Sequence, residues 1–349
     1  MKILDTTLRD GSYAVNFSFT SEFTGLMCKK LENAGFEYIE IGHGVGFNAS
    51  NRGYGKAIQT DEEYMIAAEN NLKKAKYGMF CIPGIARLED IDLASKHNIG
   101  FIRIGTDVTR VEESKQFIKK AKDYGITVAA NYMKSYAVSP EKFSKLVQIS
   151  EKFGADIVYI VDSAGGMFPE DIKKYYNSIR KISDIQIGFH GHDNLGLSIS
   201  NSLAAIDIGI EFVDSSLQGL GRSSGNACTE ILLLALKKKG FQIPIDYQKI
   251  LDLGYDDIQK FVPEKGKSPL DIISGFANFH SSYMPDILAV SEKFKINPIE
   301  LIIEYTKIDQ INMNKKNLEI IAFQLKTNDN MITKYKNYQY IGNEQNGKR

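Results

Sequence analysis

The chain has 349 residues, of which 43% are hydrophobic and 25% are charged, so it can bury a large core. Its 43 basic and 43 acidic side chains balance, which gives no overall reason to expect nucleic acid or a membrane as a partner. The first residues, MKILDTTLRDG, lack the apolar segment of a secretory signal, and no apolar run approaches the ~18 residues of a membrane span. The three cysteines lie far apart, which is typical of free thiols in a reducing compartment. We therefore expect a cytoplasmic protein.

Short apolar runs alternate with longer amphipathic stretches, which is typical of helices packed on a parallel sheet. The runs predict strands at residues 3–7, 38–41, 77–81, 101–104, 127–131, 157–161, 185–189 and 212–215. The stretches predict helices at residues 22–33, 61–75, 114–124, 140–153, 169–181 and 197–208. Many of these helices precede a glycine that can form the left-handed turn of a helix end, at Gly35, Gly100, Gly125, Gly154 and Gly209.

Eight strands that alternate with helices predict a (β/α)8 TIM barrel over residues 1–240. A doubly wound open sheet would also alternate, but its first turn carries a glycine-rich dinucleotide motif, and RDGSYA is no such motif. Amphipathic patterns at residues 250–261, 269–279, 285–294, 298–307 and 318–324 predict a C-terminal helical domain over residues 244–326. Residues 334–349 lack periodicity and predict a flexible tail.

Catalytic groups of such barrels lie at the carboxyl ends of the strands. His190 and His192 are two residues apart at the end of one predicted strand, so both imidazoles project to the same side. Asp10 comes at the end of the first strand, and barrel closure brings this strand near the one that carries His190 and His192. Two histidines and one carboxylate suit a catalytic divalent metal, although histidines can also cap a barrel rim by hydrogen bonding.

Other polar residues at these strand ends have two interpretations each. Arg9 is either a solvated salt-bridge partner or a fixed charge beside a developing oxyanion. His43 and Glu40 are either supporting groups of the site or rim packing. The glycine-rich segment 218–226 is either a flexible loop or a nest of backbone N–H groups for a carboxylate or phosphate. Ser163 is either a turn residue or a hydroxyl donor to a carboxylate.

Several motifs resemble one superfamily of metal-dependent barrels, the pyruvate aldolases and acyl-CoA lyases and synthases. LDTTLRDG and HGHDN are specific to the superfamily, whereas IEIGHGVGF and DVTRVEESKQ make the chain most similar to the 4-hydroxy-2-oxovalerate aldolase family. The resemblance runs from residue 1 to about residue 290 and also covers VDSAGG, VDSSLQGLG and SGNA. The predicted helical C-terminal region is also similar to this family, which carries a C-terminal helical domain.

The resemblance implies a ligand set, substrate contacts and a partner. Asp10, His190 and His192 would hold a divalent ion, typically Mn²⁺ with Mg²⁺ or Co²⁺ as plausible occupants. Arg9 would stabilise an enolate, and Ser163 would bind the substrate carboxylate. The substrates would be pyruvate and a small aldehyde, and the partner an acylating aldehyde dehydrogenase. The apolar faces of the helical region would equally suit a homodimer.

Two residues depart from the family. The family has a histidine base three residues after its metal aspartate, where this chain has Tyr13, and a tyrosine in the helical region, where this chain has His280. A coupled exchange would keep one imidazole and one phenol facing the substrate hydroxyl. Because imidazole is the better base near neutral pH, we hypothesise that His280 is the general base and that Tyr13 supports it. The alternative is that His280 is only a polar residue at the domain junction.

These expectations combine into a class II aldolase that cleaves or forms a 4-hydroxy-2-oxo acid. The first alternative is a Claisen-type acyltransferase or lyase of the same superfamily, which joins an acyl-CoA to a 2-oxo acid. A Schiff-base aldolase would need a lysine, for which Lys134 is the best candidate. A barrel that only binds or regulates would show no metal-dependent activity.

Overall fold

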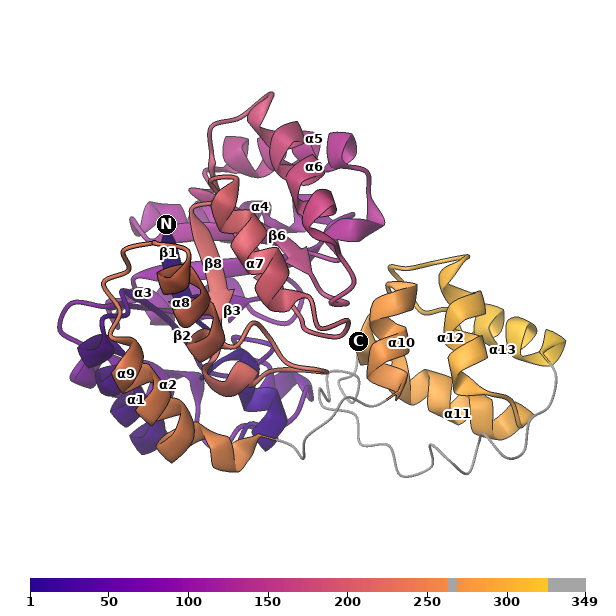
Figure 1. Ribbon diagram of the computed structural model, residues 1–349, viewed down its shortest axis with the longest axis horizontal. Helices are drawn as coiled ribbons and strands as arrows, with labels where there is room; N and C mark the ends of the chain where they lie inside the picture. The colour runs from indigo at the N-terminus through magenta and orange to yellow at the C-terminus, as the bar shows by residue number, and fades with distance from the viewer. Residues whose placement is uncertain (263–268, 326–349) are drawn as a thin grey trace.

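A closed barrel of eight parallel strands forms the larger part of the structure, a computed structural model that describes residues 1–262 and 269–325 (Figure 1). The strands pair in chain order, and β1 closes the barrel against β8. They are β1 (Lys2–Asp5), β2 (Tyr38–Ile41), β3 (Lys76–Cys81), β4 (Phe101–Asp107), β5 (Thr127–Met133), β6 (Ile157–Asp162), β7 (Gln186–Gly191) and β8 (Phe212–Ser215). All eight strands and the TIM-barrel fold predicted from the sequence are therefore confirmed.

An outer ring of helices covers the strands. It consists of α1 (Ser21–Ala34), α2 (Asp61–Asn71), α3 (Leu88–Ser95), α4 (Lys115–Asp123), α5 (Pro140–Phe153), α6 (Pro169–Arg180), α7 (Ser198–Asp207) and α8 (Thr229–Lys238). Local sequence sets several starts: Thr60 and Glu63 form a capping box before α2, and Ser139 caps α5 ahead of Pro140. Helices α3 and α8 are additions to the predicted ranges, and α2 ends at Asn71 because Leu72 is already extended.

Four of the five glycines predicted to end helices do have left-handed backbone: Gly35, Gly125, Gly154 and Gly209. The prediction for Gly100 is wrong, because the left-handed residue between α3 and β4 is Asn98, with φ 52°. Asparagine tolerates this conformation better than other residues with a side chain. Gly100 instead permits a close approach, since a Cβ there would lie 2.7 Å from Cβ of Lys76.

The chain after α8 first completes the barrel and then forms a second body. Helix α9 (Tyr247–Leu253) packs against α1 and α8, and its Ile250 and Leu253 belong to the barrel's core. Helices α10 (Pro269–Ala277), α11 (Met284–Phe294), α12 (Pro298–Thr306) and α13 (Lys315–Gln324) share a separate core. The predicted division places α9 in the helical domain, whereas the structure packs it on the barrel. The tail predicted over residues 334–349 lies outside the described residues.

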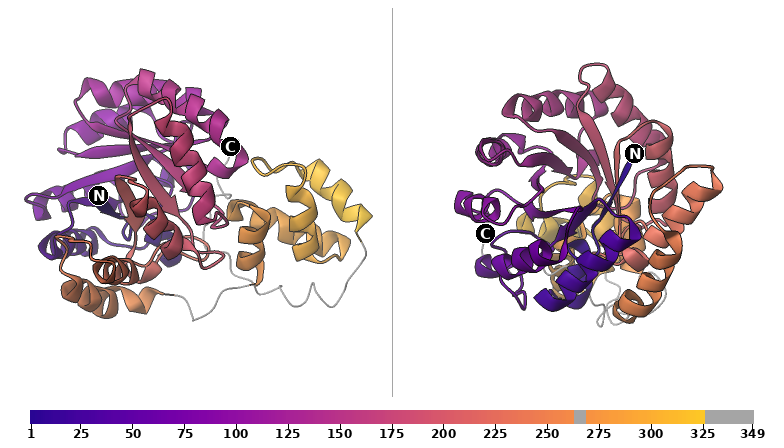
Figure 2. Two further views of the ribbon diagram at one scale, coloured as in Figure 1. Left: turned by 45° about the horizontal axis from the view of Figure 1, so that its top comes forward. Right: turned by 90° about the vertical axis from the view of Figure 1, so that its left-hand side faces the viewer.

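The helical domain lies over one end of the barrel, as the right-hand view of Figure 2 shows. Two of its contacts with the described barrel residues show which end it covers. A Cβ on Gly166, after β6, would lie 2.3 Å from the backbone oxygen of Gly275 in α10. Asn194, after β7, donates through Nδ2 to the backbone oxygen of Asp271, at 3.0 Å. The covered end is therefore the carboxyl end of the strands, where the predicted site residues lie.

The opposite end of the barrel interior is closed by apolar and aromatic side chains. Tyr159, Phe212 and Ile157 pack together there with Tyr38. The candidate site residues thus lie at the other end of the barrel. Among the described helices, none is long and apolar enough to cross a membrane.

Replacing Gly35 by Ala should destabilise the protein more than replacing Gly154 by Ala. Both glycines end a helix with nearly the same φ, 106° and 109°. A Cβ at Gly35 would lie 2.2 Å from the backbone oxygen of Pro244, whereas at Gly154 it would meet only the flexible Lys122 side chain at 3.3 Å. We expect a cost of about 1–2 kcal/mol for Gly154→Ala and at least ~1 kcal/mol more for Gly35→Ala, measured by urea unfolding. Equal losses would contradict the close contact with Pro244.

Candidate active site

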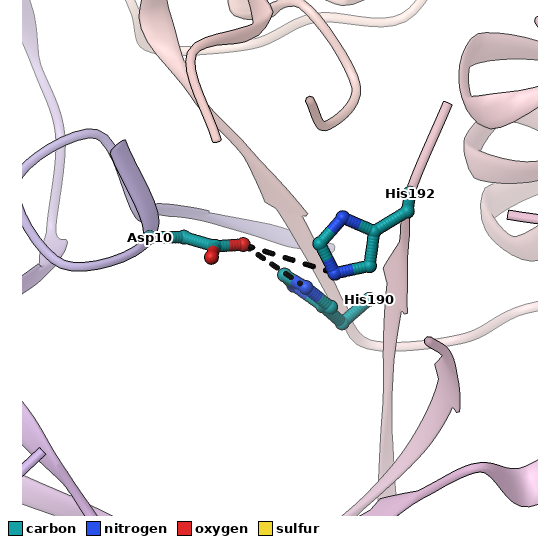
Figure 3. A group of neighbouring side chains, drawn as sticks. All are labelled: Asp10, His190 and His192. Carbon is teal, nitrogen blue, oxygen red and sulfur yellow. Dashed lines mark ion pairs between the residues drawn. The ribbon is translucent and has the colours of Figure 1, made fainter. Parts of the chain in front are cut away.

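Three buried side chains converge at the carboxyl end of the barrel. Asp10 follows β1, His190 is the last residue but one of β7, and His192 directly follows this strand (Figure 3). Oδ2 of Asp10 lies 3.5 Å from Nε2 of His190 and 4.0 Å from Nε2 of His192. One ligand atom from each residue lies within 4.8 Å of the others, and all three side chains are buried. The structure therefore brings together the three residues proposed as metal ligands.

Hydrogen bonds to the second nitrogen orient both imidazoles. Nδ1 of His190 lies 2.8 Å from Oδ2 of Asp214, and Nδ1 of His192 lies 3.2 Å from the backbone oxygen of Gly225. Because both partners are acceptors, a neutral imidazole at either position carries its proton on Nδ1 and leaves Nε2 available to a ligand. This is the tautomer that a metal ligand requires.

The charge states of Asp10 and His192 also suit a cation. Burial would raise the pKa of Asp10, but Arg9 and the two histidines hold it well below its usual value, so the carboxylate is ionised. Burial lowers the pKa of His192 to about 3, so this imidazole is neutral. Burial also opposes the charged form of His190, but Asp10 and Asp214 raise its pKa overall.

Asn226 supplies a further oxygen next to this group. Its Nδ2 donates to Oδ2 of Asp10 at 2.9 Å, while its buried Oδ1 has no hydrogen-bond partner among the described residues. An amide oxygen, a carboxylate and two imidazoles are all donors that Mn²⁺, Mg²⁺ or Co²⁺ accepts. The residues present fit a divalent cation.

A buried ionic network supports the group from inside the barrel. Arg103 on β4 donates to Oε2 of Glu40 at 2.9 Å and to Oδ2 of Asp214 at 2.6 Å. Glu40 also accepts from Nε of Arg9 at 2.7 Å, and Arg9 lies 3.4 Å from Asp10. Glu40 is thus a supporting group of Arg9 rather than a rim residue. Each of these charges is compensated, which buried ions require.

A cavity of about 410 Å³ opens above Asp10, His190 and His192, between the barrel and the helical domain. Its lining includes all the site residues predicted from the sequence: Arg9, Asp10, Tyr13, Ser163, His190, His192 and His280. Ser163 follows β6, and its Oγ accepts a hydrogen bond from the backbone N–H of Lys134 at 3.0 Å. The hydroxyl proton of Ser163 therefore remains able to donate into the cavity.

Tyr13 and His280 face this cavity from different domains, and Arg222 lies against both. NH1 of Arg222 lies 3.0 Å from Nε2 of His280, and its Cζ lies 6.0 Å from the centre of the Tyr13 ring. A guanidinium only donates, so Nε2 of His280 accepts, and Nδ1 bonds to Oγ of Ser282 at 2.6 Å. Nδ1 also lies 3.3 Å from the backbone nitrogen of Ser282, and Nε2 points toward Arg222.

Two other predicted candidates have structural partners. Nζ of Lys134 lies 3.1 Å from Oδ1 of Asp107 and donates to the backbone oxygen of Ile311 at 2.7 Å. This charged, bonded amine is poorly suited to Schiff-base chemistry. His43 stacks on Phe17, with ring centres 3.8 Å apart, and its Nε2 bonds to Gly55. Burial lowers the pKa of His43 to about 4.

Sequence reasoning missed Asp214, Arg103, Asn226 and Arg222 as site residues. Arg222 and Asn226 belong to the glycine-rich segment that was expected either to bind an anion or to be a plain loop. Asp214 and Arg103 alternate with apolar residues inside strands, as inward-facing positions do. An ionisable residue in such a buried strand is the one signal that could have identified them.

Together, a closed TIM barrel and a buried candidate metal-binding group with an arginine at its C-terminal mouth are typical of a barrel enzyme. The chain belongs to the HMGL-like family, whose sequence pattern matches residues 1–256. It is 35% identical over 330 residues to the 4-hydroxy-2-oxovalerate aldolase of Carboxydothermus hydrogenoformans, covering 93% of this chain and 97% of that one. With these relatives it is an aldolase-type carbon–carbon lyase.

Two further similarities complete the comparison. An oxaloacetate decarboxylase of Mycobacterium tuberculosis is 37% identical over 292 residues, covering 83% of this chain and 86% of that one. The solved N-terminal domain of a Bacteroides vulgatus protein superimposes with a TM-score of 0.68 at 26% identity. The superposition covers 92% of this chain and all of that domain, so it includes the helical region as well as the barrel.

Replacing Asp214 by Asn should weaken Mn²⁺ binding by about 10–100-fold, because His190 would lose the carboxylate that fixes its tautomer. Glu40→Gln is the matched control, since it also removes one buried carboxylate from Arg103 but does not touch His190. Calorimetric titration of the metal-free variants measures both affinities. An equal loss in the two variants would mean that general damage to the network, and not the tautomer, controls the affinity.

Proposed function

We propose that the chain is a divalent-metal-dependent aldolase that cleaves or forms a 4-hydroxy-2-oxo acid from pyruvate and an aldehyde. The observation that carries the proposal is the convergence of Asp10, His190 and His192 beside Arg9 at the floor of the cavity. The relatives named as 4-hydroxy-2-oxovalerate aldolases match nearly the whole chain, which favours aldol chemistry over the Claisen-type alternative.

Asp10, His190 and His192 would hold the cation, with Mn²⁺ the expected ion. When bound, the cation would act as a Lewis acid on the keto and carboxylate oxygens of the 2-oxo acid. Arg9 is held by Glu40 and lies 5.0 Å from the centre of the Phe80 ring, so its charge is fixed in place. A fixed charge stabilises the enolate that develops as the C3–C4 bond breaks, because it needs no reorganisation.

Ser163 would donate its hydroxyl proton to the substrate carboxylate. His280 would take the proton from the C4 hydroxyl, so that the C4 oxygen becomes the aldehyde carbonyl and the C3–C4 electron pair passes to the enolate. A proton delivered to C3 then completes pyruvate. Arg222 must share Nε2 of His280 or release it when the hydroxyl arrives.

Decarboxylation of a 2-oxo dicarboxylic acid is a second candidate. Loss of CO2 from oxaloacetate would break the C3–C4 bond and leave the same pyruvate enolate, with no hydroxyl proton to remove. The observation that favours it is the contact between Arg222 and Nε2 of His280, the proposed base. Because Arg222 occupies this nitrogen, a reaction that needs no base at the hydroxyl fits the contact. A relative named as an oxaloacetate decarboxylase, at 37% identity, supports it.

The cellular setting is a proposal as well. We expect a cytoplasmic protein that forms a complex with an acylating aldehyde dehydrogenase, or a homodimer. The helical domain offers apolar surface for either, with Phe276 on α10 66% exposed and Phe323 on α13 81% exposed. Light scattering and pull-down from the native host would decide, and a monomer without an associated dehydrogenase would contradict both.

Removing the metal or one of its ligands should abolish activity. We expect exhaustive chelation to stop pyruvate release from a 4-hydroxy-2-oxo acid, Mn²⁺ to restore it, and His192→Ala to prevent the restoration, because the ligand set is then incomplete. His97→Ala is the control, since His97 bonds to Glu69 and Glu62 outside the cavity. Pyruvate is followed with a coupled lactate dehydrogenase assay. Full activity after chelation would refute the metal assignment.

His280→Ala should lower turnover in aldol cleavage by about 10²–10⁴, because the reaction loses its base, and Tyr13→Phe should cost less. Tyr13→His combined with His280→Tyr should be more active than either single exchange. Oxaloacetate decarboxylation by the same variants is the comparison, since it needs no base at the hydroxyl. If His280→Ala leaves aldol cleavage intact, the base assignment is wrong.

A further inference from the structure

Asn131 is a buried amide at the floor of the cavity that no step of the proposed reaction uses. It lies on β5, is 2% exposed and lines the cavity. Two residues earlier on the same strand, Ala129 packs inside the barrel with Tyr159, so Asn131 projects into the barrel interior as well. A polar side chain in this place needs a hydrogen-bond partner, because burying an amide donor without an acceptor is unfavourable.

Arg103 fixes the orientation of this amide. Nε of Arg103 lies 3.3 Å from Oδ1 of Asn131, while its two terminal nitrogens bind Glu40 and Asp214. A guanidinium only donates, so the oxygen of the amide faces Arg103 and Nδ2 faces elsewhere. Nδ2 donates to no described residue and is not fully enclosed by protein atoms, so it is open to the cavity.

The strands on either side of β5 show what lies next to Asn131. On β4 its paired residue is Gly105, and a Cβ there would lie 2.4 Å from Cζ of Phe80, so an aromatic ring fills that side. On the other side, the ends of β5 and β6 are joined where the backbone N–H of Lys134 donates to Oγ of Ser163 at 3.0 Å. The β5–β6 edge of the floor therefore carries two uncharged donors, the amide of Asn131 and the hydroxyl of Ser163.

A carboxylate is the ligand that suits two neutral donors beside a cation site. It has two oxygens with about four lone-pair positions, so it can reach a metal ion with one oxygen and still accept hydrogen bonds. An amide N–H is also a safe neighbour for an enolate. It carries no proton that it can release near neutral pH, so it holds the carboxylate without protonating C3 early.

We propose that Asn131 donates through Nδ2 to the carboxylate of the 2-oxo acid, beside Ser163. This assignment rests on the proposed function, because it names a further binding residue for the pyruvate half of the substrate. It applies to aldol cleavage and to decarboxylation alike, since both reactions leave the same pyruvate enolate.

The test is a calorimetric titration of the full-length, Mn²⁺-loaded protein with pyruvate at pH 8. Asn131→Leu has nearly the same shape but lacks the donor, and we expect it to weaken pyruvate binding by about 10–100-fold, as the loss of a hydrogen bond to a charged group does. Asn131→Asp keeps an oxygen toward Arg103 but puts a second, charged oxygen in the place of Nδ2. It should bind pyruvate more weakly still, because two carboxylates then face each other.

The order of the two variants separates contact with the substrate from support of Arg103. If Asn131 only held Arg103, Asn131→Asp would keep that contact and bind pyruvate as the wild type does, which would refute the proposal. Mn²⁺ affinity should stay within about threefold of the wild type in both variants, because neither change touches the bond between Asp214 and His190. A loss of Mn²⁺ affinity as large as the loss of pyruvate affinity would also refute it.

Thr106→Val is the matched control. Thr106 lies on β4 next to Gly105, and its buried Oγ1 has no hydrogen-bond partner among the described residues. The exchange removes one buried polar group at the same level of the barrel, and pyruvate affinity should not change. A loss as large as that of Asn131→Leu would mean that any change at this level disturbs the floor, and the proposal would be wrong.

Two further results distinguish the possible failures. If the wild type binds pyruvate and both Asn131 variants bind it equally well, this inference fails while the proposed function stands. If the Mn²⁺-loaded wild type does not bind pyruvate at all, the proposed function fails. Thermal unfolding reports whether each variant folds, and Asn131→Asp decides by itself if Asn131→Leu does not.

Discussion

The guanidinium of Arg103, fully buried in the barrel interior, is the group on which the arrangement of the site depends. It binds Glu40 on one side and Asp214 on the other, and its Cζ lies 4.3 Å from the centre of the Tyr159 ring. Through Glu40 it fixes Arg9, and through Asp214 it fixes the tautomer of His190. Removing one member of such a network leaves a buried charge uncompensated, at a cost of about 3–5 kcal/mol. One buried cation therefore supports both Arg9, the proposed enolate-stabilising arginine, and His190, a proposed metal ligand.

The helical domain makes the second half of the site. Lys134 reaches from the end of β5 to the backbone oxygen of Ile311, and Ser223 donates to Oδ1 of Asp271 at 3.1 Å. These bonds hold His280 over the cavity, where it meets Arg222 from the barrel. The floor thus comes from strand ends, whereas the wall that faces the aldehyde is shared by two domains. Variation in this wall can change the aldehyde without disturbing the chemistry at the floor.

Much of the fold could be predicted because burial on both faces of a parallel strand produces a short apolar run. The predicted bounds of β2 and β8 match the structure, and those of β6 and β7 are within two residues. The errors have local causes. Asn98 supplies the turn expected of Gly100, and α9 packs on the barrel although its amphipathic pattern resembles that of the later helices. An apolar helix face does not specify which neighbour it will cover.

The sequence by itself determined the barrel and placed Asp10, His190 and His192 together, because strand ends meet at one rim and side chains two residues apart on a strand point the same way. It also placed Tyr13 and His280 as a possible pair. Only the tertiary structure showed that Asp214, Arg103 and Glu40 link the groups of the floor, and that Arg222 lies against both members of the pair. These contacts join residues far apart in the chain, such as Arg103 and Asp214, which are 111 positions apart, and no local pattern encodes them. Their geometry exists only once the barrel has closed and the helical domain has docked on it.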